Sequence, residues 1–105
     1  MNETQTVPAE IHKVRLIGVL GSAAGQREIQ VETRPQATVS DLIGVLLRQV
    51  GNPQFRDFLV DSATQDPRPN VIILLDEQDC NLFQGLKTVL ESDTKLTIIP
   101  VAHGG

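Results

Sequence analysis

The sequence lacks several residue types on which common classes of protein depend. Its 105 residues include no Trp, no Tyr, three Phe and one cysteine, Cys80. With so few aromatic side chains, the core has to be built from Val, Ile and Leu, and there is no aromatic series on which single-stranded nucleic acid could stack. One cysteine excludes an internal disulfide, which is typical of a reducing compartment.

Positive charge is also scarce. Nine Lys and Arg stand against 13 Asp and Glu, which gives a formal net charge of −4 and a pI of about 5.0. Nucleic-acid binding relies on clustered Lys and Arg, so we expect no direct nucleic-acid partner. The polar leader at residues 1–10 lacks the apolar stretch of a signal peptide, and no apolar run approaches the roughly 20 residues of a membrane helix. We therefore expect a cytoplasmic protein with no membrane partner.

No arrangement of nucleophiles or histidines predicts an enzyme. Cys80 has no histidine near it in the sequence, and the acidic stretch DEQD that precedes it disfavours its thiolate. His12 and His103 are isolated, and no zinc or calcium spacing is present, so we expect no metal. The stretch GSAAGQ lacks the lysine and the glycines of a phosphate-binding loop, and we expect no bound cofactor.

Acidic residues form two clusters, which could be a site of acid–base chemistry or a solvated surface. Asp76, Glu77 and Asp79 make up the first, and Glu91 and Asp93 the second. Paired carboxylates perform acid–base chemistry when their surroundings push their pKa values apart. Because both clusters sit beside turn residues and have no histidine or serine partner, a solvated turn or an acidic recognition patch is the better interpretation.

Apolar and β-branched runs predict the strands. They cover residues 13–21, 27–33, 70–76 and 95–101, with a further short strand at 81–84. The alternation of Ile29 and Val31 with polar residues in the second run has the period of a half-buried strand. The first two runs flank the predicted turn SAAGQ, which indicates a hairpin. A brief helical turn is expected near Leu86.

One helix is strongly marked. Thr38 and Asp41 have the spacing of a capping box, Gly51 stands where a helix favours a left-handed residue, and Pro53 prevents continuation. One apolar stripe runs between these signals, through Val39, Leu42, Ile43, Leu46, Leu47 and Val50. The following stretch, residues 53–70, begins with partial helical spacing and predicts a short helix or strand followed by an exposed loop.

These elements predict an α+β fold of the β-grasp type, a mixed sheet of four to five strands with one main helix on one face. In that arrangement the first and last strands pair in parallel at the centre. We expect residues 1–10 to form a flexible leader, residues 11–101 the β-grasp domain, and residues 102–105 an extended tail that ends in Gly-Gly.

The central strands are apolar on both faces, although a sheet covered on one face alternates apolar and polar residues. If Ile98 faces the helix, Ile99 and Val101 face outward, and either Leu16 or Ile17 does so in the first strand. An apolar patch on an open face marks a partner surface. We expect Ile17, Ile99 and Val101 to bind a partner; dimerisation or a third covering element would explain the pattern equally well.

The chain ends on IIPVAHGG, with His103, Gly104 and Gly105 after the last predicted strand. Two glycines without Cβ atoms can pass through a narrow channel in another protein's active site. The α-carboxylate of Gly105 is ionised at neutral pH, since its reference pKa is about 3.5, and it is a poor electrophile. It reacts only after activation, for example as an acyl adenylate made with ATP.

From about Val14 to the end, the sequence resembles the ubiquitin-like β-grasp sulfur carriers and modifiers. This group includes the molybdopterin synthase small subunit (MoaD type), the thiazole sulfur carrier (ThiS type), the ubiquitin-related modifier and the archaeal small modifier proteins. IQVETRPQATVSDLIGVLL is similar to the group's second strand and helix entry, and the GL-x-T-x-L stretch and the final strand are similar to its C-terminal half. The ending HGG is closer to the ubiquitin-related modifier, and DEQD stands where the bacterial carriers usually have Asn-Gly.

The resemblance implies a carrier rather than an enzyme. Gly105 would be adenylated by an E1-like adenylyltransferase that uses ATP, while His103 and Gly104 line its channel and Ile99 and Val101 lie on the recognition face. The activated carboxyl would become a thiocarboxylate for a sulfurtransferase or sulfur-accepting enzyme, as in tRNA thiolation, or an isopeptide bond to a target lysine. The alternatives are a MoaD-type sulfur donor and a binding module whose glycines are incidental.

Overall fold

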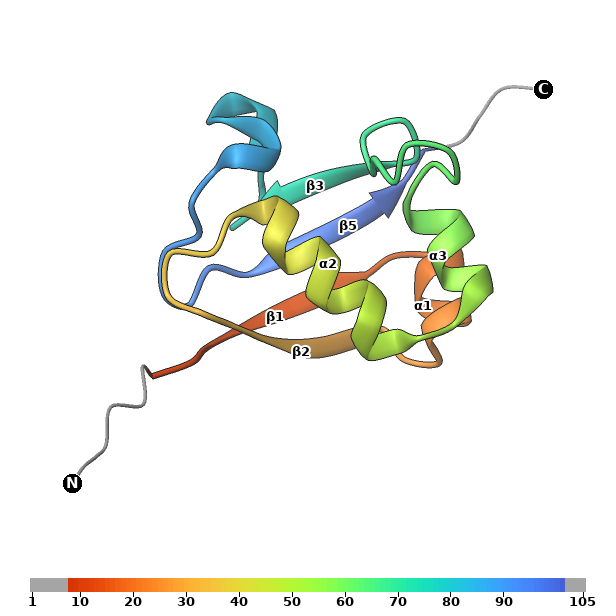
Figure 1. Cartoon of the computed structure of the whole chain (residues 1–105), viewed down its shortest axis with the longest axis horizontal. Coiled ribbons are helices and arrows are strands. Elements are labelled where there is room, and N and C mark those ends of the chain that lie inside the picture. Colours follow the sequence, from red (N-terminus) through yellow and green to blue (C-terminus); the bar gives the residue numbers. More distant parts are fainter. Residues whose placement is uncertain (1–7, 102–105) are drawn as a thin grey trace.

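The computed structural model describes residues 8–101, and five strands within this range form one sheet (Figure 1). They are β1 (Glu10–Leu16), β2 (Glu28–Thr33), β3 (Val71–Leu75), β4 (Gln78–Asp79) and β5 (Leu96–Pro100). Their order is β2-β1-β5-β3-β4, with β1 and β5 parallel and the other neighbours antiparallel. The predicted mixed sheet, with its first and last strands paired in parallel, is confirmed. β1 begins at Glu10, and the remainder of the predicted leader lies mostly outside the described residues.

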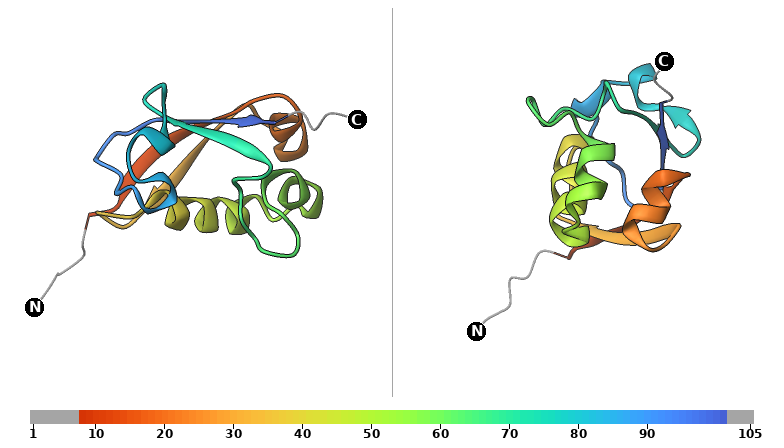
Figure 2. Two further views of the ribbon diagram at one scale, coloured as in Figure 1. Left: turned by 90° about the horizontal axis from the view of Figure 1, so that it is seen from above. Right: turned by 90° about the vertical axis from the view of Figure 1, so that its right-hand side faces the viewer.

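The main helix, α2 (Val39–Val50), crosses one face of this sheet (Figures 1 and 2). The predicted capping box is present: the Asp41 amide donates to the Thr38 hydroxyl over 3.1 Å, and the Thr38 amide donates to the Asp41 carboxylate over 3.0 Å. Gly51 ends the helix at φ 66°, as its position indicated. The predicted stripe faces the sheet, with its first four apolar residues buried and the last two partly buried.

The stretch that begins at Pro53 forms a helix, α3 (Pro53–Leu59). Of the two predicted conformations, a short helix or a strand, the helix is present. The Asn52 side chain caps it by accepting from the amides of Gln54 and Phe55, and Pro53 occupies the first turn, where no amide donor is needed. Phe55 and Leu59 are buried. The Asn52 amide group also donates to the Ala23 carbonyl over 3.0 Å, which ties α3 to the first helix.

That first helix, α1 (Val19–Ala24), corrects the sequence prediction for residues 13–25. The predicted strand to Gly21 ends at Leu16, and the predicted turn SAAGQ is largely helical. Gly18 has a φ of 58° that breaks the strand, and Gly25, at φ 79°, ends the helix. β1 and β2 are antiparallel neighbours as expected, but a helix connects them in place of a tight turn.

The segment after β3 holds a second correction. The short strand predicted at residues 81–84 is a 3-10 helix, η1 (Cys80–Leu82), and the short strand β4 precedes it at Gln78–Asp79. A further 3-10 helix, η2 (Gly85–Lys87), confirms the helical turn expected near Leu86. The carbonyl of Ala37 accepts from the Leu90 amide over 2.8 Å, so this segment is held against the entry to α2.

The core lies between the sheet and its helices. The largest fully buried side chains are Phe55, Leu16, Leu20, Leu42, Leu46, Leu59, Leu96, Ile98, His12, Val14, Val31 and Val39. His12 is the unexpected member: its Nδ1 donates to the Thr94 carbonyl over 2.8 Å, which links β1 to the residue pair that leads into β5. A buried polar group needs such a partner.

Candidate functional site

An apolar patch lies on the sheet face opposite α2. It consists of Ile17, Ile72, Ile99 and Val101, which we call the outer patch. Ile72 is 41% exposed, Ile17 and Val101 are each 36% exposed, and Ile99 is half-buried. Their chain neighbours Leu16, Ile73 and Ile98 point to the other face and are buried. These strands therefore carry apolar side chains on both faces of the sheet, as expected.

Backbone pairing brings the four residues together. Ile72 and Ile99 are directly opposite in the antiparallel pair β3–β5, so their side chains share one face. The Ile17 amide donates to the Ile98 carbonyl over 3.1 Å and so places Ile17 beside β5. The Val101 amide donates to the Asn70 carbonyl over 2.9 Å, which extends the pairing one residue beyond the strand. The outer patch therefore reaches the last described residue of the chain.

The structure agrees with the outward orientation predicted for Ile17, Ile99 and Val101, and it assigns Leu16 to the core. It adds Ile72, which the sequence did not single out; the signal was present, because VIILL is apolar in both phases of a strand. The three tail residues of the predicted site, His103, Gly104 and Gly105, lie outside the described residues. Whether the outer patch binds a partner stays a prediction.

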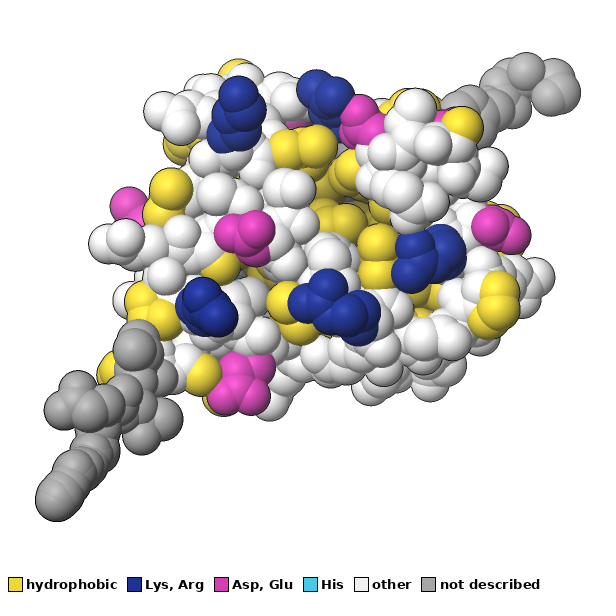
Figure 3. Space-filling view, viewed as in Figure 1, with side chains coloured by type: hydrophobic (Ala, Val, Ile, Leu, Met, Phe, Trp, Pro, Cys, Tyr) yellow, Lys and Arg dark blue, Asp and Glu magenta, His cyan; other side chains and the backbone are white. Residues whose placement is uncertain are grey.

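The other half of the same face, on β1 and β2, carries charged and polar side chains together with the exposed Ile11. Lys13 and Arg15 point outward from β1, and the residues directly opposite them on β2 are Gln30 and Glu28. Arg15 also lies next to Thr97 of β5. The outer patch is thus an apolar area bordered by mixed charge, whereas Lys, Arg, Asp and Glu side chains are interspersed across the face that α2 covers (Figure 3).

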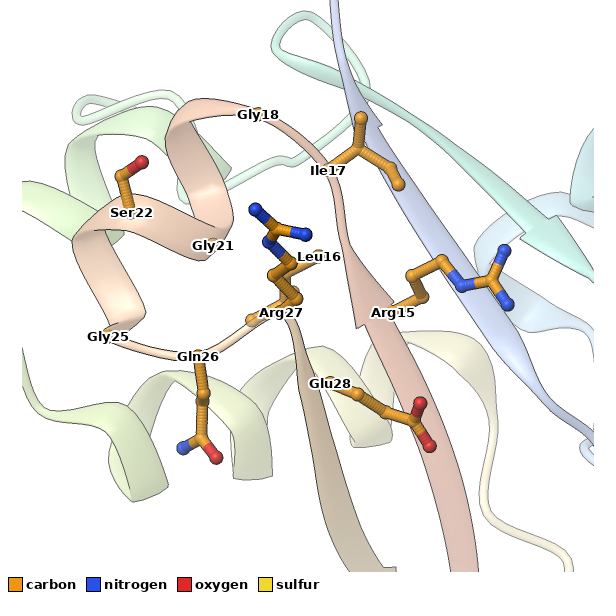
Figure 4. A pocket seen from close by; sticks show the side chains of 10 residues that line it. All are labelled: Arg15, Leu16, Ile17, Gly18, Gly21, Ser22, Gly25, Gln26, Arg27 and Glu28. Atoms are coloured by element: carbon orange, nitrogen blue, oxygen red, sulfur yellow. The ribbon is translucent and has the colours of Figure 1, made fainter.

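A hollow of about 740 Å³ borders the outer patch at the end of β1 (Figure 4). Ile17, Arg15 and Arg27 line it together with the backbone of α1. Gly21 makes this packing possible, because a Cβ atom there would lie 2.9 Å from the Leu16 carbonyl oxygen. α1 is therefore held against the end of β1, at the point where the chain turns and exposes Ile17.

The other candidates for chemistry are Cys80 and the possible metal ligands. Cys80 is buried, and burial, with a further contribution from the charge of Asp79, raises the pKa of its thiol, as the sequence indicated. Among residues 8–101, no group of three or more His, Cys, Asp or Glu is arranged to hold a metal ion. Within the same range no helix is long and apolar enough to cross a membrane.

Solved structures with the same fold are available for comparison. Small archaeal modifier protein 1 from Methanosarcina acetivorans superposes with a TM-score of 0.77 at 21% identity, covering 93% of this chain and 99% of that one. Urm1 from Trypanosoma brucei gives 0.70 at 24% identity, with coverage of 92% and 97%. CysO from Mycobacterium tuberculosis gives 0.68 at 19% identity, with coverage of 86% and 98%. No curated protein matches the sequence significantly.

The mixed sheet, the single crossing helix and these likenesses define the class: this is a ubiquitin-like β-grasp protein. The family follows from the sequence. The model of the Urm1 (Ubiquitin related modifier) family matches residues 13–105, so the chain belongs to that family. Its place among the ubiquitin-like β-grasp modifiers and sulfur carriers, which the sequence resembles, is confirmed.

Proposed function

We propose that this protein is a ubiquitin-like carrier whose C-terminal Gly105 carboxylate is adenylated by an E1-like enzyme. ATP, bound by that enzyme, would supply the adenylyl group and leave pyrophosphate. Hydrosulfide from a sulfide donor would then displace AMP to give a thiocarboxylate, or a lysine amine would displace AMP to form an isopeptide bond. In this scheme the protein is a substrate and performs no catalysis itself.

The observation that carries the proposal is the position of the outer patch in a chain of the Urm1 family. Ile99 is the second-last residue of β5 and Val101 directly follows the strand; one residue, Ala102, separates Val101 from His103, Gly104 and Gly105. An enzyme that covers Ile17, Ile72 and Ile99 would hold the strand end and so restrict where the following four residues can reach, roughly 13 Å when extended. Apolar area of this kind favours association.

The same geometry supports a role for each patch residue. Ile72 and Ile99, paired across β3 and β5, would form the centre of the contact, and Ile17 and Val101 its border on the tail side. His103 and Gly104 would pass through the enzyme's channel, where residues without bulk meet the least obstruction. A sulfurtransferase or a sulfur-accepting enzyme would be the later partner.

Two outcomes of activation remain to be separated. The family name, ubiquitin related modifier, favours conjugation to lysine, while similarity to a structure described as a putative molybdopterin converting factor subunit from Pyrococcus furiosus, at 18% identity and a TM-score of 0.69, keeps the sulfur-donor alternative in view. Sulfur transfer to a tRNA base would use the same thiocarboxylate chemistry as the sulfur-donor alternative.

Intact mass spectrometry tests the proposal. The protein is incubated with its activating enzyme, ATP and a sulfide donor, and the exchange of one carboxyl oxygen for sulfur is the expected result for a carrier. Lysine-linked conjugates on a denaturing gel are the expected result for a modifier. A chain without Gly105 is the control and should give neither. If the full chain forms no adenylate and no conjugate either, the binding-module alternative is correct.

A further inference from the structure

A second apolar surface lies at the end of the molecule opposite Val101. Leu82 is 74% exposed, Phe83 49% and Val89 51%. The other two Phe residues of the chain, Phe55 and Phe58, are buried or half-buried. Figures 1 and 2 both place the 80–87 segment away from the end where β5 leads toward the C-terminus. This surface is therefore separate from the outer patch.

These apolar side chains are held on a fixed scaffold. Cys80 and Leu90, at the two ends of the segment, are buried. Inside it, the Phe83 amide donates to the Cys80 carbonyl over 3.0 Å, and the Gln84 amide donates to the Thr88 hydroxyl over 2.9 Å. Val89 is bridged to Thr38 at the start of α2. A backbone ordered before binding loses less entropy when a partner arrives.

Phe83 and Val89 form the walls of a groove of about 170 Å³ whose floor includes the buried Leu75 and Leu90. An apolar cavity of about 150 Å³ accepts a benzene-sized group. The groove thus has space for one aliphatic side chain of a partner, and filling it would remove Phe83 and Val89 from water.

The border of the groove is acidic. Asp76 and Glu91 line it, and no Lys or Arg is among the described residues that do so. The first acidic turn is held beside the second because the Asp76 amide donates to the carbonyl of Lys95, the residue that follows the turn of Glu91, over 2.8 Å, and the Lys95 amide donates to the Asp76 carboxylate over 2.9 Å. Both clusters noted in the sequence therefore contribute to one surface.

We propose that this groove binds a segment of a partner protein that carries an aliphatic side chain flanked by Lys or Arg. The aliphatic group would fill the groove between Phe83 and Val89, and the flanking cations would face Asp76 and Glu91. A second copy of the chain fits less well, because a two-fold contact would bring the two acidic borders together. Binding here leaves the outer patch free for another protein.

The test is a titration followed by NMR amide shifts, with the acetylated and amidated peptide KRLRK as the probe. We expect saturable shifts at Leu75, Phe83, Val89 and Leu90. The peptide KRGRK, which lacks the aliphatic group, should bind about tenfold more weakly, and the acidic peptide EELEE should leave these amides unchanged. Equal binding of all three peptides, or shifts confined to the outer patch, would overturn the proposal.

Variants locate the binding to the groove. Phe83→Ser and Glu91→Lys should each weaken KRLRK binding about tenfold, while their matched controls on the outer face, Ile72→Ser and Glu32→Lys, leave it unchanged. Circular dichroism checks folding, and Glu91→Lys, at an exposed site, gives a second test if Phe83→Ser does not fold. If the protein self-associates and Phe83→Ser abolishes that association, the groove binds a second copy of the chain and the proposal is wrong. The activating enzyme is absent, so the result is independent of the proposed function.

Discussion

Ile98 and Ile99 are adjacent in β5, chemically identical and differently placed. Ile98 is fully buried beneath α2, whereas Ile99 lies on the outer face opposite Ile72. One side chain contributes to the core and the other to the outer patch. The difference shows that apolar content in this sheet exceeds what its fold requires, and apart from Ile11 at the start of β1, the excess is gathered where the chain approaches its C-terminus.

The largest expected effect comes from truncating the buried member of this pair. Ile98→Ala removes methyl groups from a closely packed core and should lower the free energy of unfolding by about 3 kcal/mol. Ile99→Ala should lower it by roughly 1 kcal/mol or less, because this side chain is only half-buried. Urea denaturation measures both. Equal losses would mean that the two faces contribute equally to the fold.

A second comparison concerns two helical glycines. Gly21→Ala would bring a Cβ atom to 2.9 Å from the Leu16 carbonyl oxygen, so α1 has to move, and we expect a loss of about 2 kcal/mol. Gly44 in α2 is the control, since its nearest neighbour is the flexible Arg48 guanidinium at 3.7 Å. Gly44→Ala should stabilise by up to about 1 kcal/mol. Thermal unfolding gives both signs, and a stable Gly21→Ala protein would contradict the close approach.

Charge on the outer face should impair activation while the fold is retained. Ile99→Asp places a carboxylate at the centre of the outer patch, and we expect the kcat/KM of adenylation by the activating enzyme to fall about tenfold. Gln30→Asp, on the polar half of the same face, is the control and should keep its activity. Circular dichroism of both variants should match the parent; unfolding of Ile99→Asp would show that Ile99 is needed for folding.

The smallest effect concerns the turn between β3 and β4, which belongs to neither face. Asp76 and Glu77 have φ values of 46° and 74°, positions where a two-residue hairpin favours Asn-Gly. Glu77→Gly should therefore stabilise by about 1 kcal/mol. Gln78→Gly, in the ordinary strand geometry that follows, should destabilise by a similar amount. Chemical denaturation distinguishes the two signs, and adenylation should be unchanged in both.

Elements with a complete local signal could be predicted from the sequence. α2 has its capping box, its apolar stripe and its terminal glycine, and all three operate as expected. α1 has only the terminal glycine, Gly25: VLGSAA is six residues long, begins with strand-forming residues and lacks a side-chain cap. A helix this short is unstable alone and depends on packing, here the close contact of Gly21 with the end of β1.

The candidate site was predictable to a similar extent. When a strand is apolar at every position, one set of alternating side chains must face outward. Which set does so is decided by pairing with the neighbouring strands. Leu16 is buried and Ile17 exposed because the chain leaves β1 at that point and turns at Gly18. Ile72 joins the outer patch through its register with Ile99, which a single sequence does not contain.

By itself, the sequence determined the element types with strong local signals, the β-grasp order, and the presence of more apolar strand surface than one helix covers. Only the tertiary structure decided which apolar residues are buried, that His12 belongs to the core, and that two acidic turns meet beside Phe83. The physical reason is the range of the interactions. Capping and helical periodicity act over a few residues, whereas strand register and groove formation join residues far apart in the chain.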